Sequence, residues 1–207
     1  MVGRSNVGKS SLINRLVGER IARTSAAPGK TRLANVYRVV RGSGEPLYLV
    51  DLPGYGYARG GRQAAAQFEE LTAAYFTTVR LKADTTTAAL LLVDSRHPGL
   101  ESDREAWAWL RNTVDAAAIV ATKIDKLARG QRIRAMRQLE SAFEHPVLPV
   151  SAVTGEGLDE LWTLIDKLTN NSSSRKPPDN SRPSSPNRLP RATAARHRRK
   201  APRPQKE

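Results

Sequence analysis

The chain has 207 residues, no cysteine and a formal net charge of +14. The missing cysteines exclude a disulfide framework, a cysteine-based metal site and a thiol nucleophile. No apolar run of about 18 residues occurs and no apolar leader follows Met1, so the sequence predicts a cytoplasmic protein without a membrane span. The length suits one domain with an appended tail.

The positive charge is concentrated near the C-terminus. Residues 170–207 contain eleven Lys or Arg against two acidic residues, are rich in Pro and Ser, and have few large apolar side chains. Such a segment cannot bury enough surface to offset the entropy lost on ordering, so we expect a folded domain at 1–169 and a disordered tail at 170–207. The basic cluster Arg191–Lys200 would either bind a phosphate backbone or only increase solubility.

Before the tail, short apolar runs alternate with amphipathic stretches. In chain order we expect a helix at Lys9–Val17, strands at Ala34–Arg41 and Leu47–Asp51, a helix at Arg62–Val79, a strand at Ala88–Asp94, a helix at Ser102–Thr113, a strand at Ala116–Thr122, a helix at Arg129–Phe143, a strand at Pro146–Val150 and a helix at Gly157–Leu168. This alternation predicts an α/β fold with a doubly wound, mostly parallel sheet. Only Gly42–Gly44 separates the first two of these strands, which predicts a hairpin and one antiparallel edge strand.

A phosphate-binding pattern lies at the start of the chain. The segment Gly3-Arg4-Ser5-Asn6-Val7-Gly8-Lys9-Ser10 has Gly, four residues, then Gly-Lys-Ser. Its backbone N–H groups would converge on phosphate oxygens at a helix N-terminus, while Lys9 would neutralise the outer phosphates and the Ser10 hydroxyl would bind Mg²⁺. A purely structural glycine turn is the alternative, so the pattern needs support from the rest of the chain.

That support comes from three further segments. Asp51-Leu52-Pro53-Gly54 follows an apolar strand, where Asp51 would reach Mg²⁺ through water and the Gly54 N–H would contact a γ-phosphate. The second segment is Thr122-Lys123-Ile124-Asp125, and the third is Val150-Ser151-Ala152.

The last two segments point to guanine. The Asp125 carboxylate would accept two hydrogen bonds from guanine, which adenine cannot supply, and a backbone N–H at Ser151-Ala152 would lie near the guanine O6. The order of the segments at strand ends therefore predicts GTP binding, and it disfavours a P-loop kinase or ATPase.

The polar loop Gly18–Arg32 lies between the phosphate loop and Asp51. A nucleotide switch needs a hydroxyl there to complete the magnesium site when the γ-phosphate is present. Thr24, Ser25 and Thr31 are candidates, and spacing does not choose among them.

The motifs resemble those of the bacterial EngB (YihA/YsxC) GTPases, in the TrmE-Era-EngA-YihA-Septin class of Ras-like P-loop GTPases. The resemblance runs from Gly3 to Leu168 and is carried by Gly3–Asn14, Pro28–Thr31, Asp51–Ala58 and Asp94–Pro98. It implies that Thr31 is the switch threonine and a magnesium ligand beside Ser10. The neighbours Gly29, Lys30, Arg32 and Leu33 then belong to the nucleotide site.

The same resemblance implies a biological role. The family is implicated in late assembly of the large ribosomal subunit and in normal cell division and septation. We therefore expect rRNA and ribosomal proteins as partners, and a monomer. The competing hypothesis is an RNA-binding assembly factor that acts through its basic tail and has a vestigial nucleotide site.

The catalytic residues expected from the resemblance are Lys9, Thr31, Gly54 and Asn6. Ras-like enzymes have a water-orienting Gln after the Asp-x-x-Gly motif, whereas this chain has Tyr55. Asn6 resembles the asparagine that binds K⁺ in related potassium-stimulated GTPases, so we expect slow hydrolysis helped by K⁺ or by a ribosomal partner. A loop-stabilising hydrogen bond is the alternative role for Asn6.

Only Met1 and Val2 precede the phosphate loop, although a buried central strand normally leads into it. We therefore expect a truncated first strand, with unpaired backbone groups on its neighbours. The two explanations are a start placed within a longer chain and a fragment with weakened nucleotide affinity.

Overall fold

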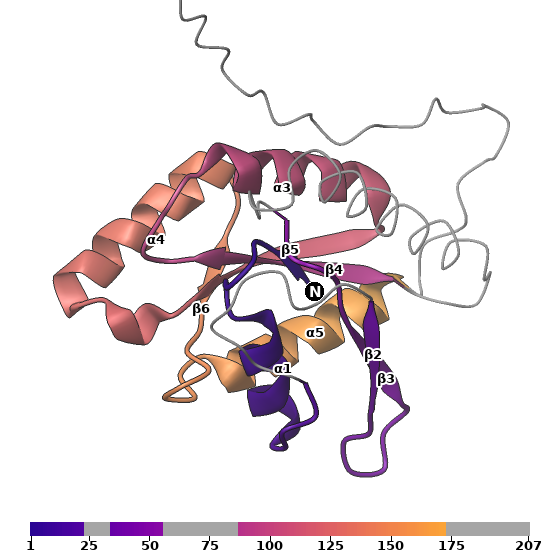
Figure 1. The fold of residues 1–207 in the computed structure, drawn as a ribbon. Coiled ribbons are helices and arrows are strands. Elements are labelled where there is room, and N and C mark those ends of the chain that lie inside the picture. The colour runs from indigo at the N-terminus through magenta and orange to yellow at the C-terminus, as the bar shows by residue number, and fades with distance from the viewer. Residues whose placement is uncertain (23–33, 56–86, 173–207) are drawn as a thin grey trace, which may run out of the picture.

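The structure is a computed structural model that describes residues 1–22, 34–55 and 87–172 (Figure 1). Its elements are β1 (Val2–Gly3), α1 (Lys9–Val17), β2 (Asn35–Val39), β3 (Leu47–Asp51), β4 (Ala88–Asp94), α3 (Glu101–Thr113), β5 (Ala116–Thr122), the short 3-10 helix η2 (Ile124–Lys126), α4 (Arg129–Phe143), β6 (Val147–Pro149) and α5 (Leu158–Ser172). The helix expected at Arg62–Val79 lies outside the described residues. None of the described helices has the length and apolar character needed to span a membrane.

The strands form two sheets. Strands β1, β4, β5 and β6 pair in that order as a parallel sheet, and β2 pairs antiparallel with β3 as a separate sheet. The expected mostly parallel α/β fold with an antiparallel hairpin is therefore confirmed. Between β2 and β3, the Gly44 N–H donates to the Arg41 carbonyl at 3.0 Å. This turn explains why β2 ends at Val39, two residues before the expected end.

The strand that leads into the phosphate loop is present, but it has only two residues. Val2 and Gly3 pair in parallel with Leu91 and Leu92 in the middle of the seven-residue β4. The Leu52 N–H donates to the Met1 carbonyl at 3.3 Å, so single hydrogen bonds replace a ladder between β1 and β3. The short β1 is why the hairpin forms its own sheet.

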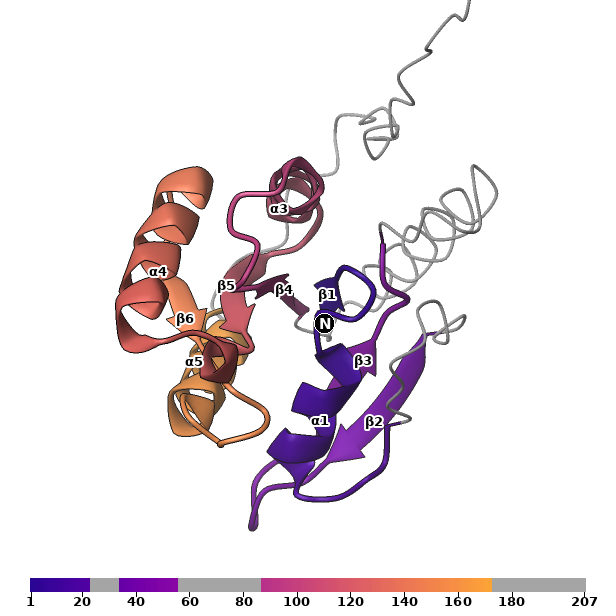
Figure 2. The ribbon, with the colours of Figure 1, turned by 60° about the vertical axis from the view of Figure 1, so that its left-hand side comes forward.

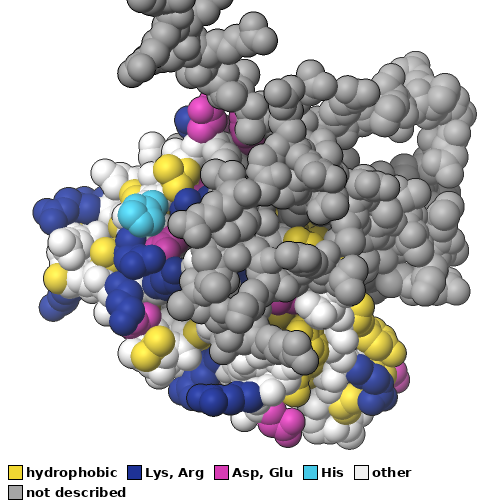
Figure 3. All heavy atoms as spheres, viewed as in Figure 1, with side chains coloured by type: hydrophobic (Ala, Val, Ile, Leu, Met, Phe, Trp, Pro, Cys, Tyr) yellow, Lys and Arg dark blue, Asp and Glu magenta, His cyan; other side chains and the backbone are white. Residues whose placement is uncertain are grey.

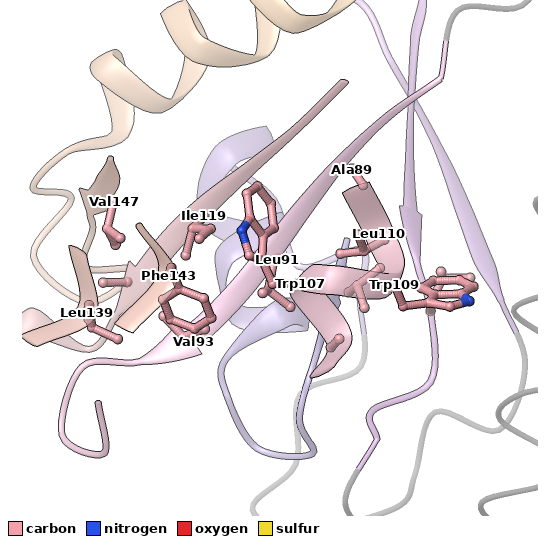
Figure 4. Packing of buried hydrophobic residues seen from close by; sticks show 14 residues of the cluster. Ala89, Leu91, Val93, Trp107, Trp109, Leu110, Ile119, Leu139, Phe143 and Val147 are labelled. Carbon is pink, nitrogen blue, oxygen red and sulfur yellow. The ribbon is translucent and has the colours of Figure 1, made fainter. Parts of the chain in front are cut away.

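Helices cover both faces of the parallel sheet (Figures 1 and 2). Helices α3 and α4 lie on one face, where Trp107, Leu110 and Phe143 pack against β4 and β5 (Figure 4). Helices α1 and α5 lie on the other face, where the buried cluster includes Leu12 and Leu161. The β4 sequence Ala-Ala-Leu-Leu-Leu-Val-Asp has no polar residue before its end because both of its faces are buried.

Helix α5 is longer than expected. It continues to Ser172, so the domain boundary expected at residue 169 falls inside the helix. The remaining tail residues, 173–207, lie outside the part of the chain that the structure describes.

Candidate nucleotide-binding site

The phosphate loop connects β1 to α1. Gly8, the residue just before α1, has a φ of 109°, and Asn6 has a φ of 63°, a region that few residues other than glycine adopt. No described side chain caps α1, so the N–H groups of its first turn point out of the helix without a cap. This geometry is the usual setting for a bound phosphate.

Lys9 is buried in the first turn of α1. Its ammonium group donates to the Gly3 carbonyl at 3.1 Å and to the Arg4 carbonyl at 3.4 Å. Burial lowers the pKa of Lys9 to about 8, although the Asp51 carboxylate acts in the opposite direction. The predicted phosphate lysine therefore lies inside its own loop, held by backbone oxygens.

The two predicted magnesium residues that the structure describes lie next to each other. The Ser10 hydroxyl donates to Asp51 Oδ2 at 2.8 Å, although 41 positions separate the residues in the sequence. Asp51 is 1% exposed, and its Oδ1 atom has no hydrogen-bond partner among the residues that the structure describes. A buried carboxylate oxygen without a donor is costly unless a cation or water satisfies it.

The segment after β3 packs directly on the phosphate loop. The Ser5 N–H donates to the Tyr55 carbonyl at 3.0 Å, and a Cβ atom on Gly54 would lie only 2.6 Å from the Ser5 nitrogen. Glycine is therefore required at position 54 for this approach. Leu52 and Pro53, the two predicted residues between Asp51 and Gly54, are buried.

A buried polar cluster that the motifs did not predict holds Tyr55. Its hydroxyl donates to Asp103 Oδ1 at 2.7 Å, and the Arg4 guanidinium lies 3.2 Å from the same oxygen. Burial and the Asp103 carboxylate raise the pKa of Tyr55, so it remains a neutral donor. Burial also raises the pKa of Asp103, against the hydrogen bond from Tyr55 and the charge of Arg4. The phosphate loop, the segment after β3 and α3 thus meet at one carboxylate.

The predicted guanine residues come together at the ends of β5 and β6. The Ser151 hydroxyl donates to Asp125 Oδ1 at 2.7 Å and accepts the N–H groups of Val153 and Thr154. Ser151 is fully buried, so its side chain organises the loop that follows β6. Ile124 is also fully buried, which leaves the Asp125 carboxylate at the pocket surface.

A cavity of about 170 Å³ lies between the phosphate loop, the end of β5 and the loop after β6. The predicted residues that line it are Val7, Gly8, Thr122, Lys123, Asp125, Val150 and Ala152. It is also lined by Ser11, Leu12, Lys126 and Val153, which the motif analysis did not name. Each of these four follows a predicted motif by one or two positions, so extending the motifs along the chain would have found them.

Asp94, at the end of β4, is a second residue whose role the motifs did not predict. Its carboxylate accepts the Lys123 ammonium at 2.9 Å and the Arg96 guanidinium at 2.7 Å. Burial alone raises the pKa of Asp94, but the hydrogen bonds from Arg96 and Lys123 outweigh burial and hold the pKa well below its usual value. Lys123 also donates to the Asn6 carbonyl. Lys123 therefore links Asp94, at the end of β4, to the phosphate loop.

The structure does not describe the residues that were candidates for the switch. Thr24, Ser25 and the segment Gly29-Lys30-Thr31-Arg32-Leu33 lie in residues 23–33, outside the described ranges. Just before this range, the Asn14 side chain on α1 forms two hydrogen bonds with the Ala22 backbone, at 2.7 and 2.8 Å.

The fold, the phosphate loop and the guanine-reading segment define a P-loop GTPase, and comparisons with known proteins agree. The family model described as "50S ribosome-binding GTPase" matches residues 1–124. The crystal structure of a probable GTP-binding protein EngB has a TM-score of 0.61 at 23% identity, covering 82% of this chain and 97% of that one. Aquifex aeolicus Era bound to GDP·AlF4⁻ has a TM-score of 0.66 at 24% identity and covers 81% of this chain, which spans only 55% of that Era chain.

The curated relatives identify the family more closely. The probable GTP-binding protein EngB of Chlorobaculum parvum is 42% identical over 168 residues, covering 80% of this chain and 83% of the relative. The protein with the same description from Geobacillus kaustophilus is 38% identical over 170 residues, again covering 80% and 83%. The chain therefore belongs to the EngB family of GTP-binding proteins.

Proposed function

We propose that this chain binds GTP with Mg²⁺ and hydrolyses it as a molecular switch in assembly of the large ribosomal subunit. The observation that carries the proposal is the meeting of Ser10, Asp51 and Lys9 beside a pocket that contains Asp125. These groups would supply a metal site, a phosphate counter-charge and a guanine-selective acceptor at one edge of the sheet.

The donor set suits Mg²⁺, which prefers hydroxyl and carboxylate oxygens. Ser10 would bind the ion directly and Asp51 through water, since Asp51 Oδ1 has no hydrogen-bond partner among the described residues and can accept a bond in this role. Thr31 is the proposed third residue of the site. When bound, Mg²⁺ would neutralise charge that develops on the phosphates.

Competition between the Tyr55 carbonyl and a γ-phosphate for the Ser5 N–H supports the proposed switch. In this structure the Ser5 N–H is taken by the Tyr55 carbonyl. A γ-phosphate that used this donor would release the segment after β3 from the phosphate loop, whereas GDP would leave it in place. Only such a difference in contacts lets one nucleotide shift a conformational equilibrium relative to the other.

Slow hydrolysis helped by K⁺ is part of the proposal. The Tyr55 hydroxyl is committed to Asp103, so Tyr55 is not placed to orient water as a Gln would. Asn6 remains the candidate for K⁺, which would add positive charge near the phosphates. We expect faster turnover in KCl than in NaCl, with the difference removed in Asn6→Ala. Equal rates in both salts for the unmodified chain would refute the role of K⁺.

The cellular part of the proposal is a cytoplasmic monomer that acts on a precursor of the large ribosomal subunit and is required for normal cell division and septation. It is supported by the description of the matching family as ribosome-binding and by the EngB relatives. The competing hypothesis is RNA binding by the basic tail with a vestigial nucleotide site.

One experiment separates the two hypotheses. Sedimentation with large-subunit precursors is measured with GDP, with a non-hydrolysable GTP analogue and without nucleotide, for the full chain and for Lys9→Ala. A switch predicts that the analogue increases binding and that Lys9→Ala abolishes the increase, while Lys167→Ala, an exposed residue on α5, leaves it intact. Salt-sensitive binding to the precursors that changes neither with the nucleotide nor in Lys9→Ala would support the tail hypothesis.

A further inference from the structure

Helix α4 carries a basic surface that the nucleotide site does not use. Arg129, Arg134 and Arg137 are exposed, and no ion pair involves any of them within the described ranges 1–22, 34–55 and 87–172. Ile133 lies among them with 47% of its surface exposed. We call these four residues the α4 basic face.

The helical period explains how this face arises. Arg129, Ile133 and Arg137 are spaced by four residues, so they form one row about 12 Å long, and Arg134 lies beside it. The opposite side of the helix buries Ala135 and Leu139 against the sheet. The arginines therefore project away from the core.

Stability of the helix does not account for these charges. Arg129 lies in the first turn of α4, where a positive charge opposes the helix dipole and no acidic residue compensates, and Arg134 and Arg137 lie beyond the turns on which the dipole acts. Helix α3, by contrast, begins with Glu101 and Asp103. The segment Lys123–Arg137 contains six Lys or Arg and one acidic residue. The segment Glu101–Arg111 contains two Lys or Arg and three acidic residues.

The α4 basic face also lies away from the β2–β3 hairpin. Helix α4 flanks the β6 end of the sheet, and the β2–β3 hairpin lies at the other end (Figures 1 and 2). Dark blue Lys and Arg side chains gather over the α4 side in Figure 3. A large polyanion on this face would leave the hairpin uncovered.

We propose that the α4 basic face docks the phosphodiester backbone of RNA, a partner surface that rests on the proposed ribosomal function. All three charged residues are arginines, whose planar guanidinium binds two phosphate oxygens at once and is more weakly hydrated than an ammonium. Arg132 is separate from this face, because its guanidinium points inward to the Ile124 carbonyl and to Glu156.

The test measures anisotropy of a labelled 20-base-pair RNA duplex with the full chain loaded with GDP, over a series of KCl concentrations. In Arg134→Gln/Arg137→Gln we expect at least about tenfold weaker binding at about 0.1 M salt, and a salt dependence of log K shallower by about 2, since each phosphate contact contributes about 0.9. Glutamine keeps the helix propensity of arginine, so α4 remains folded.

The matched control is Arg104→Gln/Arg111→Gln, which removes two exposed arginines from α3. We expect its affinity and salt dependence to equal those of the unmodified chain. Arg134→Lys/Arg137→Lys keeps the charge and should retain the salt dependence with weaker affinity. Equal losses from the α3 and α4 pairs, or no loss from the α4 pair, would overturn the proposal.

Two further measurements distinguish failure of the RNA assignment, of the docking proposal and of the GTPase proposal. Competition by polyglutamate as strong as that by unlabelled RNA of equal charge would overturn the RNA assignment in favour of an acidic protein. GDP affinity and GTP turnover are measured on the same proteins. If Arg134→Gln/Arg137→Gln binds RNA as the unmodified chain does and hydrolyses GTP normally, only the docking proposal is refuted. If the unmodified chain binds RNA through α4 but does not hydrolyse GTP, the GTPase proposal is refuted and the docking proposal is retained.

Discussion

The two sides of the candidate nucleotide site are supported by different strands. We call them the guanine side, around Asp125 and Ser151, and the phosphate side, around the phosphate loop. The guanine side is carried by β4 and β5, which pair over seven residues, whereas the phosphate side is carried by β1, which pairs over two. On the guanine side, the hydrogen-bond ladder between β4 and β5 holds the loops that follow these strands. On the phosphate side loop and side-chain contacts replace it, notably the packing of Tyr55 on Ser5 and Asp103. We therefore expect similar substitutions to cost more free energy of unfolding on the guanine side.

The largest difference is expected in the two sheets themselves. Leu91→Ala, at a fully buried position of β4, should lower the free energy of unfolding by about 4 kcal/mol, because its packed surroundings cannot collapse into the cavity. Leu49→Ala, in the two-stranded sheet, should cost about 2 kcal/mol because the hairpin can shift toward the gap. Urea denaturation measures both values, and equal losses would contradict the comparison.

The next largest effect is expected at the junction of the two sides. Asp94→Asn should cost about 2 kcal/mol, toward the low end for a buried pair because Lys123 and Arg96 are partly exposed. The pKa of Asp94 is held below its unfolded value of about 3.9. Its contribution is therefore complete above about pH 4 and is lost as the pH falls through the folded pKa.

The direction of this pH dependence can be measured directly. The difference in melting temperature between the unmodified chain and Asp94→Asn should be constant from about pH 5 to pH 7 and narrow below about pH 4. A difference that widens in acid would show that Asp94 is not the anchor of Lys123 and Arg96.

A smaller effect is expected at the contact that closes the phosphate side. Tyr55→Phe removes one hydrogen bond to Asp103 and should cost about 1 kcal/mol. Because that contact favours the form in which Tyr55 packs on Ser5, the ratio of GTP to GDP affinity should rise about fivefold. Tyr48→Phe, at an exposed position on β3, is the control and should leave the ratio unchanged.

The smallest effect is expected where α4 touches the guanine loops. The Arg132 guanidinium donates to the Ile124 carbonyl at 3.2 Å and pairs with Glu156, whose carbonyl accepts the Ser151 N–H. Arg132→Met should weaken GDP binding about threefold, measured by calorimetry, since one partly exposed hydrogen bond contributes below about 1 kcal/mol. Arg129 forms no ion pair within the part of the chain that the structure describes, so Arg129→Met should bind GDP like the unmodified chain.

Local patterns in the sequence predicted most of the fold. The bounds of α1, β3, β4, β5 and α4 agree with the structure, because each is an uninterrupted apolar run or an amphipathic period between clear ends. The motif residues Ser10, Asp51 and Asp125 also lie where their spacing predicts, although their roles toward the nucleotide remain proposals.

Contacts between distant segments could not be predicted in this way. Tyr55 and Asp103 lie 48 positions apart, and nothing local in either segment indicates that the two side chains meet. The division into two sheets depends on how far β1 extends along β4, which is a property of non-local backbone pairing. Asp94 lies in the family segment Asp94–Pro98, but its contact with Lys123, 29 positions away, depends on how β4 and β5 pair in the fold.

The Thr122 hydroxyl lies 2.7 Å from the Val7 carbonyl and 3.1 Å from the Val93 carbonyl, between the two sides of the site. A hydroxyl has a single proton, so two acceptors compete for one donor. At any instant the proton joins β5 either to the phosphate loop or to β4, and rotation about one bond exchanges the two. An asparagine amide would offer two protons, and the present threonine therefore leaves this junction one donor short.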